Sequence, residues 1–179
     1  VQWSDWRWQQ RNRITRLDAL ERVLQLSDSE RRGCLATENR FRLAITPYYL
    51  ELMDPVDPEC PIRRQAVPTI AEMEIVDGES PDPLAEEAHM PSPGLTHRYP
   101  DRALLYASHN CPVYCRFCTR KRKVSDPSSA LGERLIKEAL ETIRKTPAIR
   151  EVIISGGDPL SLSNAKIAGL LDALSAIPH

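Results

Sequence analysis

Hydrophobic positions in the second half of the chain follow two patterns in turn. Residues 103–107 (ALLYA) and 151–155 (EVIIS) are apolar runs of strand length. Apolar residues recur every three or four positions over 131–143, and again over 167–174 behind Ser163, a residue type that favours a helix N-cap. Strands that alternate with helices predict parallel βαβ units, whose ligands bind at the carboxyl ends of the strands.

The front of the chain predicts helices without strands. Two residue pairs have the spacing of capping boxes that begin helices: Thr15 with Asp18, and Ser27 with Glu30. A further apolar segment, 41–53, is interrupted by Pro47, which predicts a break in that helix. We therefore expect a helical amino-terminal extension over residues 1–53.

Residues 54–97 differ in composition from both neighbours. Eight prolines lie between positions 55 and 93, and the stretch 72–87 contains seven acidic residues and neither Lys nor Arg. This composition predicts a Pro-rich acidic linker that wraps the surface, with one short helix near 69–74. Residues 98–179 are then the first part of an α/β domain, so the fold class is α/β with a helical extension.

Composition limits the binding partners and the cellular compartment that we expect for this protein. The net charge is −1, so the chain as a whole has no field that favours nucleic acid or a membrane surface. We find no apolar run of membrane length and no signal peptide. Five cysteines, three of them clustered, argue against a secreted disulfide framework and favour a cytoplasmic protein. Cys34 and Cys60 lie outside any ligand spacing and are expected to be incidental buried thiols.

The clustered cysteines carry the clearest chemistry. Cys111, Cys115 and Cys118 have the spacing C-x3-C-x2-C, with Phe117 just before the third. A structural zinc site takes four ligands, and an ordinary four-iron ferredoxin cluster takes four cysteines. Three local thiolates instead fit a 4Fe-4S cluster with one iron open to a substrate. A zinc knuckle, or three unrelated core thiols, is the simpler alternative.

A second motif follows the strand at 151–155. Gly156 and Gly157 allow the backbone to approach a ligand closely, and Asp158 adds a carboxylate that can accept from an ammonium group. A Gly-Gly pair alone is weak evidence because most such pairs form turns. Here the pair lies one βα unit beyond the cysteine loop, and this position makes it much stronger evidence for a ligand site.

Together these motifs resemble the radical S-adenosylmethionine superfamily. Several stretches are more specifically similar to the lysine 2,3-aminomutase family: 5–14, 45–50, 93–102, 111–120 and 155–158. The resemblance therefore spans nearly the whole chain. It implies a partial (βα)6 barrel, of which this chain holds only the first βα units, so the chain looks truncated.

The family resemblance also implies roles for individual residues. Cys111, Cys115 and Cys118 would hold the 4Fe-4S cluster. Phe117, Gly156, Gly157 and Asp158 would bind S-adenosylmethionine. Arg98, Tyr99 and Arg102 would bind pyridoxal phosphate, and Arg120 would bind the substrate carboxylate. The family's pyridoxal-binding lysine and its zinc cysteines would lie beyond residue 179, so no catalytic residue is assigned within this chain.

The implied activity is that of an isomerase. Such an enzyme moves an amino group from the α to the β carbon of a free amino acid, by default L-lysine to β-lysine, with glutamate or arginine as alternative substrates. The resemblance also implies a flavodoxin-type or ferredoxin-type electron donor and a homo-oligomer. This fragment alone is expected to be inactive.

One alternative belongs to another functional class. Arg116 and the run Arg120–Lys123 place five basic residues beside the cysteines, with His109 as a fourth potential ligand, as in a small zinc module that binds nucleic acid. The patch is local, however, and its aromatic residues are not interleaved with the basic ones as a base-stacking platform requires. The Gly-Gly-Asp motif would also be unexplained, so we favour the enzyme.

Overall fold

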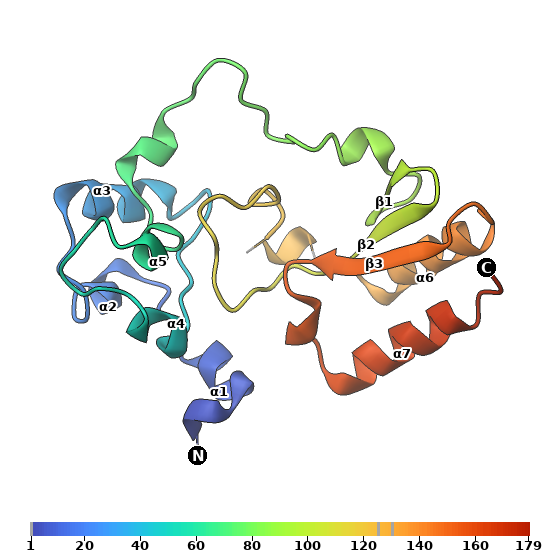
Figure 1. Ribbon diagram of the computed structural model, residues 1–179, viewed down its shortest axis with the longest axis horizontal. Helices are drawn as coiled ribbons and strands as arrows, with labels where there is room; N and C mark the ends of the chain where they lie inside the picture. The colour runs from blue at the N-terminus through green and yellow to red at the C-terminus, as the bar shows by residue number, and fades with distance from the viewer. Residues whose placement is uncertain (1, 125, 130) are drawn as a thin grey trace. The chain divides into compact units, whose positions relative to one another are not determined.

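A computed structural model describes residues 2–124, 126–129 and 131–179. The chain forms two compact units, one of Val1–Glu79 with Pro112–Ser125 and one of Ser80–Cys111 with Asp126–His179. The first unit is helical and the second is α/β (Figure 1). The mixed α/β class predicted from the hydrophobic pattern is therefore present, while the predicted domain boundaries at residues 54 and 98 stay a prediction.

Short helices build the first unit. They are α1 (Trp6–Arg11), α2 (Leu17–Leu20), α3 (Asp28–Thr37), α4 (Pro47–Glu51) and α5 (Pro61–Arg64), with the 3-10 helices η1 (Gln2–Ser4) and η2 (Ile70–Met73). Their core is formed by Leu20, Leu24, Leu26, Cys34, Leu43, Ile45, Met53, Ala66 and Val67. The short helix predicted near 69–74 is confirmed as η2.

The two predicted capping boxes have different outcomes. The box at Ser27 is confirmed, because its hydroxyl accepts from the Glu30 backbone and the Glu30 carboxylate accepts from the Ser27 backbone. The box at Thr15 is wrong, because α2 begins after Arg16 without a side-chain cap. Ile14 exchanges two backbone hydrogen bonds with Ile45, of 2.8 and 3.0 Å, and this pairing keeps the chain extended past Thr15.

Prolines in this unit begin helices. Pro47 was expected to interrupt the segment 41–53, and this is confirmed: residues 41–46 are not helical, and Pro47 is a first-turn residue of α4. Pro61 begins α5 in the same way, inside the stretch predicted to be a surface linker. The side chain of Arg63 in α5 is fully buried, as is Ala66 just beyond it. This part of the proline-rich stretch is therefore core.

The second unit is built on a three-stranded sheet. Its strands are β1 (Leu95–Tyr99), β2 (Arg102–Ser108) and β3 (Glu151–Gly156), in the order β1-β2-β3, with β1 antiparallel and β3 parallel to β2. Its helices are α6 (Glu133–Arg144) and α7 (Asn164–Ser175), with the 3-10 helices η3 (Glu87–His89), η4 (Pro127–Ser129) and η5 (Pro159–Ser161). The predicted β2, β3, α6 and α7 and the parallel βαβ unit are confirmed, whereas β1 was not predicted.

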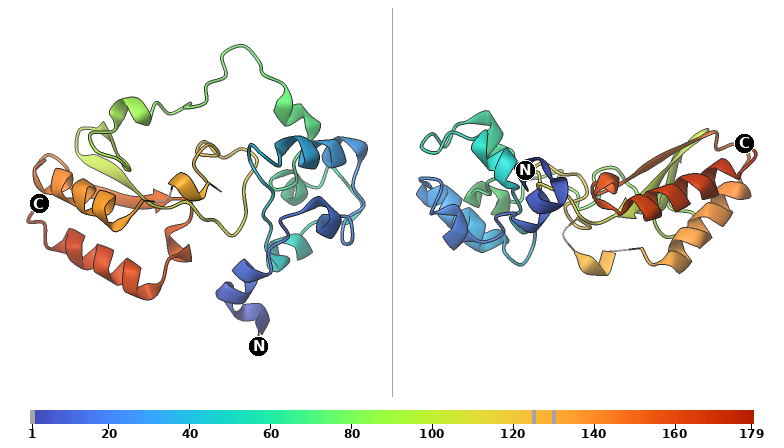
Figure 2. Two further views of the ribbon diagram at one scale, coloured as in Figure 1. Left: turned by 180° about the vertical axis from the view of Figure 1, so that it is seen from behind. Right: turned by 90° about the horizontal axis from the view of Figure 1, so that it is seen from below.

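Both helices of this unit pack on the same face of the sheet. Apolar residues of α6 and α7 share one core with alternate residues of the strands: Leu95, Ala103, Leu105, Ala107, Ala139, Leu140, Ile143, Ile149, Leu170 and Ile177. Figure 2 shows the two helices running beside the strands. The register pairs Leu104 with Ile153, so these two residues point to the opposite face, where Ile153 remains 45% exposed.

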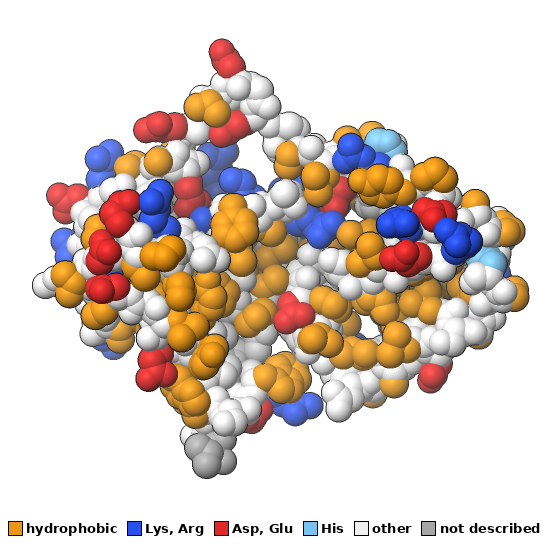
Figure 3. All heavy atoms as spheres, viewed as in Figure 1, with side chains coloured by type: hydrophobic (Ala, Val, Ile, Leu, Met, Phe, Trp, Pro, Cys, Tyr) orange, Lys and Arg blue, Asp and Glu red, His pale blue; other side chains and the backbone are white. Residues whose placement is uncertain are grey.

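On the face drawn in Figure 3, acidic and basic side chains are interspersed over the helical unit, and hydrophobic side chains are visible between β3 and α7 of the second unit. None of the helices in the described residues has the length and apolarity needed to cross a bilayer.

Candidate functional site

The cysteine loop follows β2, and its middle is anchored in the helical unit. Tyr114 and Arg116, on either side of Cys115, are 9% and 7% exposed. Their backbone N–H groups donate to carbonyls of the helical unit over 2.9 and 2.8 Å. Beyond them, Cys118 donates its backbone N–H to the carbonyl of Cys115 over 3.0 Å, which closes a tight turn. The buried neighbours therefore fix the turn that carries two of the three predicted ligands.

The Arg116 side chain is held by several partners in the helical unit. It forms a two-pronged ion pair with Glu72 of η2, with N–O distances of 2.8 and 2.7 Å. It also donates to the carbonyls of Phe41 and Arg42, and its guanidinium lies 4.5 Å from the centroid of the Phe41 ring. In the sequence, Arg116 is one of five basic residues beside the cysteines, and Glu72 is one of the acidic residues of the predicted linker. The structure removes Arg116 from the basic patch, which weakens the nucleic-acid alternative.

All five cysteines are free, and their surroundings separate two classes. Cys34 and Cys60 are buried, as expected, whereas Cys111, Cys115 and Cys118 are partly exposed. Burial raises the pKa of Cys34 to about 11, so this thiol stays protonated at neutral pH. Burial also raises the pKa of Cys115, and the neighbouring Cys118 raises it further.

The predicted cluster fits the donor chemistry of these residues. Three free thiols at this spacing suit iron and sulfide, which favour thiolate ligands. Cys111 ends its segment of the second unit, and Cys115 and Cys118 belong to the first. Nowhere in residues 2–124, 126–129 and 131–179 do three or more His, Cys, Asp or Glu side chains converge as a ready-made metal site. The assignment therefore rests on residue type and spacing.

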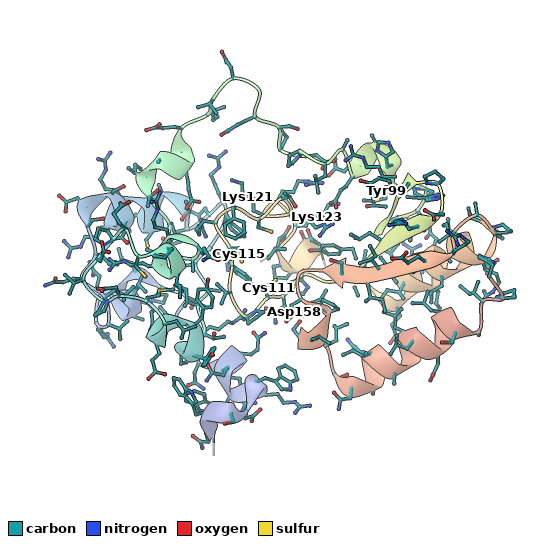
Figure 4. The ribbon with its side chains drawn as sticks, viewed as in Figure 1. Tyr99, Cys111, Cys115, Lys121, Lys123 and Asp158 are labelled. Carbon is teal, nitrogen blue, oxygen red and sulfur yellow. The ribbon has the colours of Figure 1, made fainter. Side chains whose placement is uncertain are left out.

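The Gly-Gly-Asp motif lies against the residues that lead into Cys111. Gly157 donates its backbone N–H to the Ser108 carbonyl, and Asp158 donates to the Asn110 carbonyl, over 2.5 and 2.7 Å. The hydroxyls of Ser108 and Ser161 lie 3.1 Å apart beside them. Figure 4 shows Cys111 and Asp158 next to each other where β2 and β3 end. The structure thus brings together the first predicted cluster ligand and the second motif, as parallel strands predict.

Both glycines are required by this close approach. Gly156 has φ +126°, a conformation that L side chains rarely adopt, and an added Cβ would meet the Ser108 carbonyl. At Gly157 an added Cβ would meet the backbone of Asn110. The pair therefore explains how the turn packs against the Cys111 segment, whether or not a ligand binds there.

Asp158 also has a structural role. It is the N-cap of η5, and its carboxylate accepts from the Leu160 backbone N–H over 2.9 Å. A capping carboxylate and a ligand-binding carboxylate are compatible, because a carboxylate has two oxygens with several acceptor positions. Phe117, predicted to contact the same ligand, is 69% exposed on the cysteine loop.

The three residues predicted to bind pyridoxal phosphate lie at the other end of the sheet. Tyr99 pairs with Arg102 across the turn between β1 and β2, so both point to the face opposite α6 and α7. Arg98 instead donates to the Leu84 carbonyl over 2.9 Å. Arg102 begins β2 and the Cys111 segment follows its end, so the seven residues of the strand separate the two groups by roughly 20 Å.

The guanidinium groups at this end are accessible. Tyr99 is 59% exposed, and the Arg102 side chain is 47% exposed, with an ion pair to Asp101 of 3.3 Å. Hydrogen bonds from Arg150 and then Arg102 hold the pKa of Asp101 below its ordinary value. The hydrogen-bond donors of Arg98 and Arg102 suit a phosphate dianion, although the two side chains do not form a single binding site in this structure. Arg120 lies in the turn after Cys118, where its backbone carbonyl accepts from Lys123 and Val124.

Comparison with known proteins agrees with the motifs. A family model described as "4Fe-4S single cluster domain" matches residues 100–177, which include the three cysteines and the Gly-Gly-Asp turn. The L-lysine 2,3-aminomutase of Fusobacterium nucleatum is 45% identical over 178 residues, and that of Clostridium subterminale is 44% identical over 177. The glutamate 2,3-aminomutase of Clostridioides difficile is 37% identical over 177 residues.

These alignments cover 99% of this chain but 42% of each of the three relatives. The chain thus spans about two fifths of the length of the curated relatives that it matches. Over the residues that it spans, the chain belongs to the lysine 2,3-aminomutase family.

Proposed function

We propose that the whole protein carrying this chain is a radical S-adenosylmethionine, pyridoxal-phosphate-dependent isomerase that converts L-lysine to β-lysine. The observation that carries the proposal is the similarity to lysine 2,3-aminomutases along nearly the entire chain, together with three free cysteines at cluster spacing. Glutamate is the second candidate substrate, because a glutamate 2,3-aminomutase matches the same residues at lower identity.

In this proposal the residues of the chain bind and orient. Cys111, Cys115 and Cys118 hold the 4Fe-4S cluster, which supplies the electron for cleaving S-adenosylmethionine. Phe117 and the Gly156–Asp158 turn bind that cofactor, with Asp158 accepting from its ammonium group. Arg120 binds the substrate carboxylate. The glycines serve by letting the turn pack against the backbone of Ser108 and Asn110, which places the Asp158 carboxylate beside the Cys111 segment.

Pyridoxal phosphate is the second proposed cofactor, and it supplies stabilisation of the radical while the amino group migrates. Arg98, Tyr99 and Arg102 would hold it, with the guanidinium groups contacting its phosphate. Their side chains are accessible, which supports the assignment. Because Arg98 now donates to the Leu84 carbonyl, binding would require it to exchange that contact for the phosphate.

A larger barrel would cover the sheet edge and the sheet face that remain exposed in the second unit. Among the described strands, β3 is at the edge of the sheet, and Ile153, on the face that also bears Leu104, remains 45% exposed. A partial (βα)6 barrel would add further parallel strands beside β3 and enclose this face. We propose that the chain forms the first βα units of such a barrel.

The remaining proposals concern partners and compartment. A low-potential flavodoxin or ferredoxin would reduce the cluster, and the whole protein would form a homo-oligomer. Five free cysteines suit a reducing compartment, for which we propose the cytoplasm.

The first test supplies the whole protein with all proposed components. After anaerobic reconstitution with iron and sulfide, the protein is incubated with dithionite, S-adenosylmethionine, pyridoxal phosphate and one of L-lysine, L-glutamate or L-arginine. We expect β-lysine, identified by mass spectrometry, and only when pyridoxal phosphate is present. If only glutamate or only arginine yields a β-amino acid, that amino acid is the substrate in place of lysine. Absence of any isomerised amino acid would refute the aminomutase assignment.

A second prediction separates the two roles of Asp158. Asparagine caps helices about as well as aspartate, so Asp158→Asn keeps the contact to Leu160 while removing the charge. We expect Asp158→Asn to weaken S-adenosylmethionine binding about 10- to 100-fold, because a hydrogen bond to a charged group contributes about 1.5–3 kcal/mol. Equilibrium dialysis measures the affinity.

Iron content and the unfolding midpoint of Asp158→Asn should match the parent protein. Asp158→Ala is the companion variant, and it should lose affinity equally while also losing the cap. If Asp158→Asn binds S-adenosylmethionine with parental affinity, Asp158 serves only as the N-cap of η5.

A further inference from the structure

Glu72 and Arg116 form a largely buried ion pair next to the cysteine loop. Its side chains are 18% and 6% exposed, and the residues are 44 positions apart in the sequence. By contrast, the pair between Glu59 and Arg64 in the same unit has side chains that are 75% and 63% exposed.

The guanidinium of Arg116 uses four of its five N–H donors on fixed partners. Two go to the two oxygens of Glu72, and two go to the carbonyls of Phe41 and Arg42. The planar fork also lies over the Phe41 ring. Lysine has three donors on a single nitrogen and cannot reproduce this arrangement. The position therefore requires the shape of arginine as well as its charge.

These contacts act on the backbone between two predicted ligands. Arg116 directly follows Cys115, and its own N–H donates to the Gln65 carbonyl over 2.8 Å. Fixing Arg116 by both side chain and backbone fixes the start of the turn that ends at Cys118. Both carboxylate oxygens of Glu72 accept from the Arg116 guanidinium, so Glu72 acts on the turn through Arg116.

We propose that Glu72 is a positioning residue for the cluster site, which holds the turn from Cys115 to Cys118 through the Arg116 guanidinium. The helical unit and the acidic stretch that contains η2 thereby contribute to cluster retention without supplying a ligand. Partners that orient ligands from outside the coordination sphere commonly change metal affinity 10- to 100-fold when they are replaced. This inference rests on the proposed function, in which these cysteines bind the cluster.

The test compares variants of the whole protein. Glu72→Gln removes the charge, Arg116→Lys keeps the charge without the fork, and Glu72→Asp keeps the carboxylate with a shorter reach. Glu59→Gln breaks the exposed pair of the same unit and is the matched control. The measurements are iron and sulfide per chain after anaerobic reconstitution, the rate of iron release to a chelator well below the unfolding midpoint, and alkylation of the thiols in metal-free protein.

We expect iron release from Glu72→Gln and Arg116→Lys to be about 10- to 100-fold faster than from the parent. Glu72→Asp should restore part of the retention, and Glu59→Gln should equal the parent. In metal-free protein, Cys115 and Cys118 of the first two variants should react faster with iodoacetamide, while Cys60 should not change.

The outcomes separate this inference from the proposed function. If the parent retains its cluster but the first two variants release iron and react with iodoacetamide at parental rates, the positioning role is refuted. If Glu72→Gln fails to fold, Arg116→Lys decides the matter, because a parental release rate in that folded variant would refute the positioning role. A parent that binds no iron would instead refute the cluster itself.

Discussion

Replacing Cys115 with alanine in the whole protein should abolish the iron–sulfur cluster. The chain supplies three cysteines at cluster spacing, and Cys34 and Cys60, its other two, are buried elsewhere in the helical unit. With one thiolate removed, two local ligands remain, which is too few to hold a four-iron cluster. We expect iron to fall from about four per chain to nearly none, with loss of the brown colour and of the visible absorption.

Two kinds of control make this result specific. Cys111→Ala and Cys118→Ala should lose iron to the same extent, because each removes one of the same three ligands. Cys34→Ala and Cys60→Ala should retain it: the raised pKa of Cys34 keeps that thiol protonated, and Cys60 accepts a backbone hydrogen bond from Asp54. Full iron retention in Cys115→Ala would show that the motif is not the cluster site.

The largest effect on stability is expected at Arg63. Its side chain is fully buried and contacts both oxygens of Glu30 over 2.8 Å, as well as the carbonyls of Gln25 and Asp54. Arg63→Met has similar length but leaves the Glu30 carboxylate buried without its cation. Removing one partner of a buried pair commonly costs about 3–5 kcal/mol. We expect urea unfolding of the whole protein, followed by far-UV circular dichroism, to show a loss of this size in the transition of the helical unit.

The adjacent arginine provides the control. Arg64 forms an ion pair of similar length with Glu59, but both side chains are exposed, so Arg64→Met should cost less than about 1 kcal/mol. Equal effects of the two substitutions would contradict the assigned role of burial. The double variant Arg63→Met with Glu30→Met should recover part of the loss, since no buried charge is then unpaired.

The pH dependence gives an independent check on this pair. Burial alone would raise the pKa of Glu30, but hydrogen bonds from Arg63 and Ser27 outweigh it and hold the pKa below the ordinary value of 4.5. The folded state then binds fewer protons, so the pair stabilises above pH 4.5 and this contribution is lost as pH falls through the lowered pKa. The stability difference between the parent and Arg63→Met should therefore shrink in acid.

Local sequence signals predicted much of the second unit, because its elements are long enough for periodicity to show. The apolar runs at β2 and β3, the spacing in α6 and the Ser163 cap of α7 each match the structure. Strand β1 was missed because its residues were interpreted only through their resemblance to the family's pyridoxal phosphate site. The alternation around Thr96 and the Pro100–Asp101 turn before β2 were the available signals of a hairpin.

The first unit was harder to predict because its structure depends on distant pairs. Nothing local to Thr15 indicates that Ile14 pairs with Ile45, and this pairing displaced the expected cap. Contacts between distant residues were equally hard to predict at the candidate functional site. The cysteine spacing and the two glycines were apparent from the sequence, whereas the link from Glu72 to Arg116 joins a stretch that looked like linker to a residue that looked like surface.

The interleaving of the two units has a consequence during synthesis of the chain. Glu72 leaves the ribosome 44 residues before Arg116, an interval of about 2–9 s at ordinary translation rates. Throughout that interval the carboxylate of Glu72 and the ring of Phe41 lack the guanidinium that later covers them. The helical unit is therefore completed only after the first two strands of its neighbour have been made, so its folding cannot finish in the order in which its residues are translated.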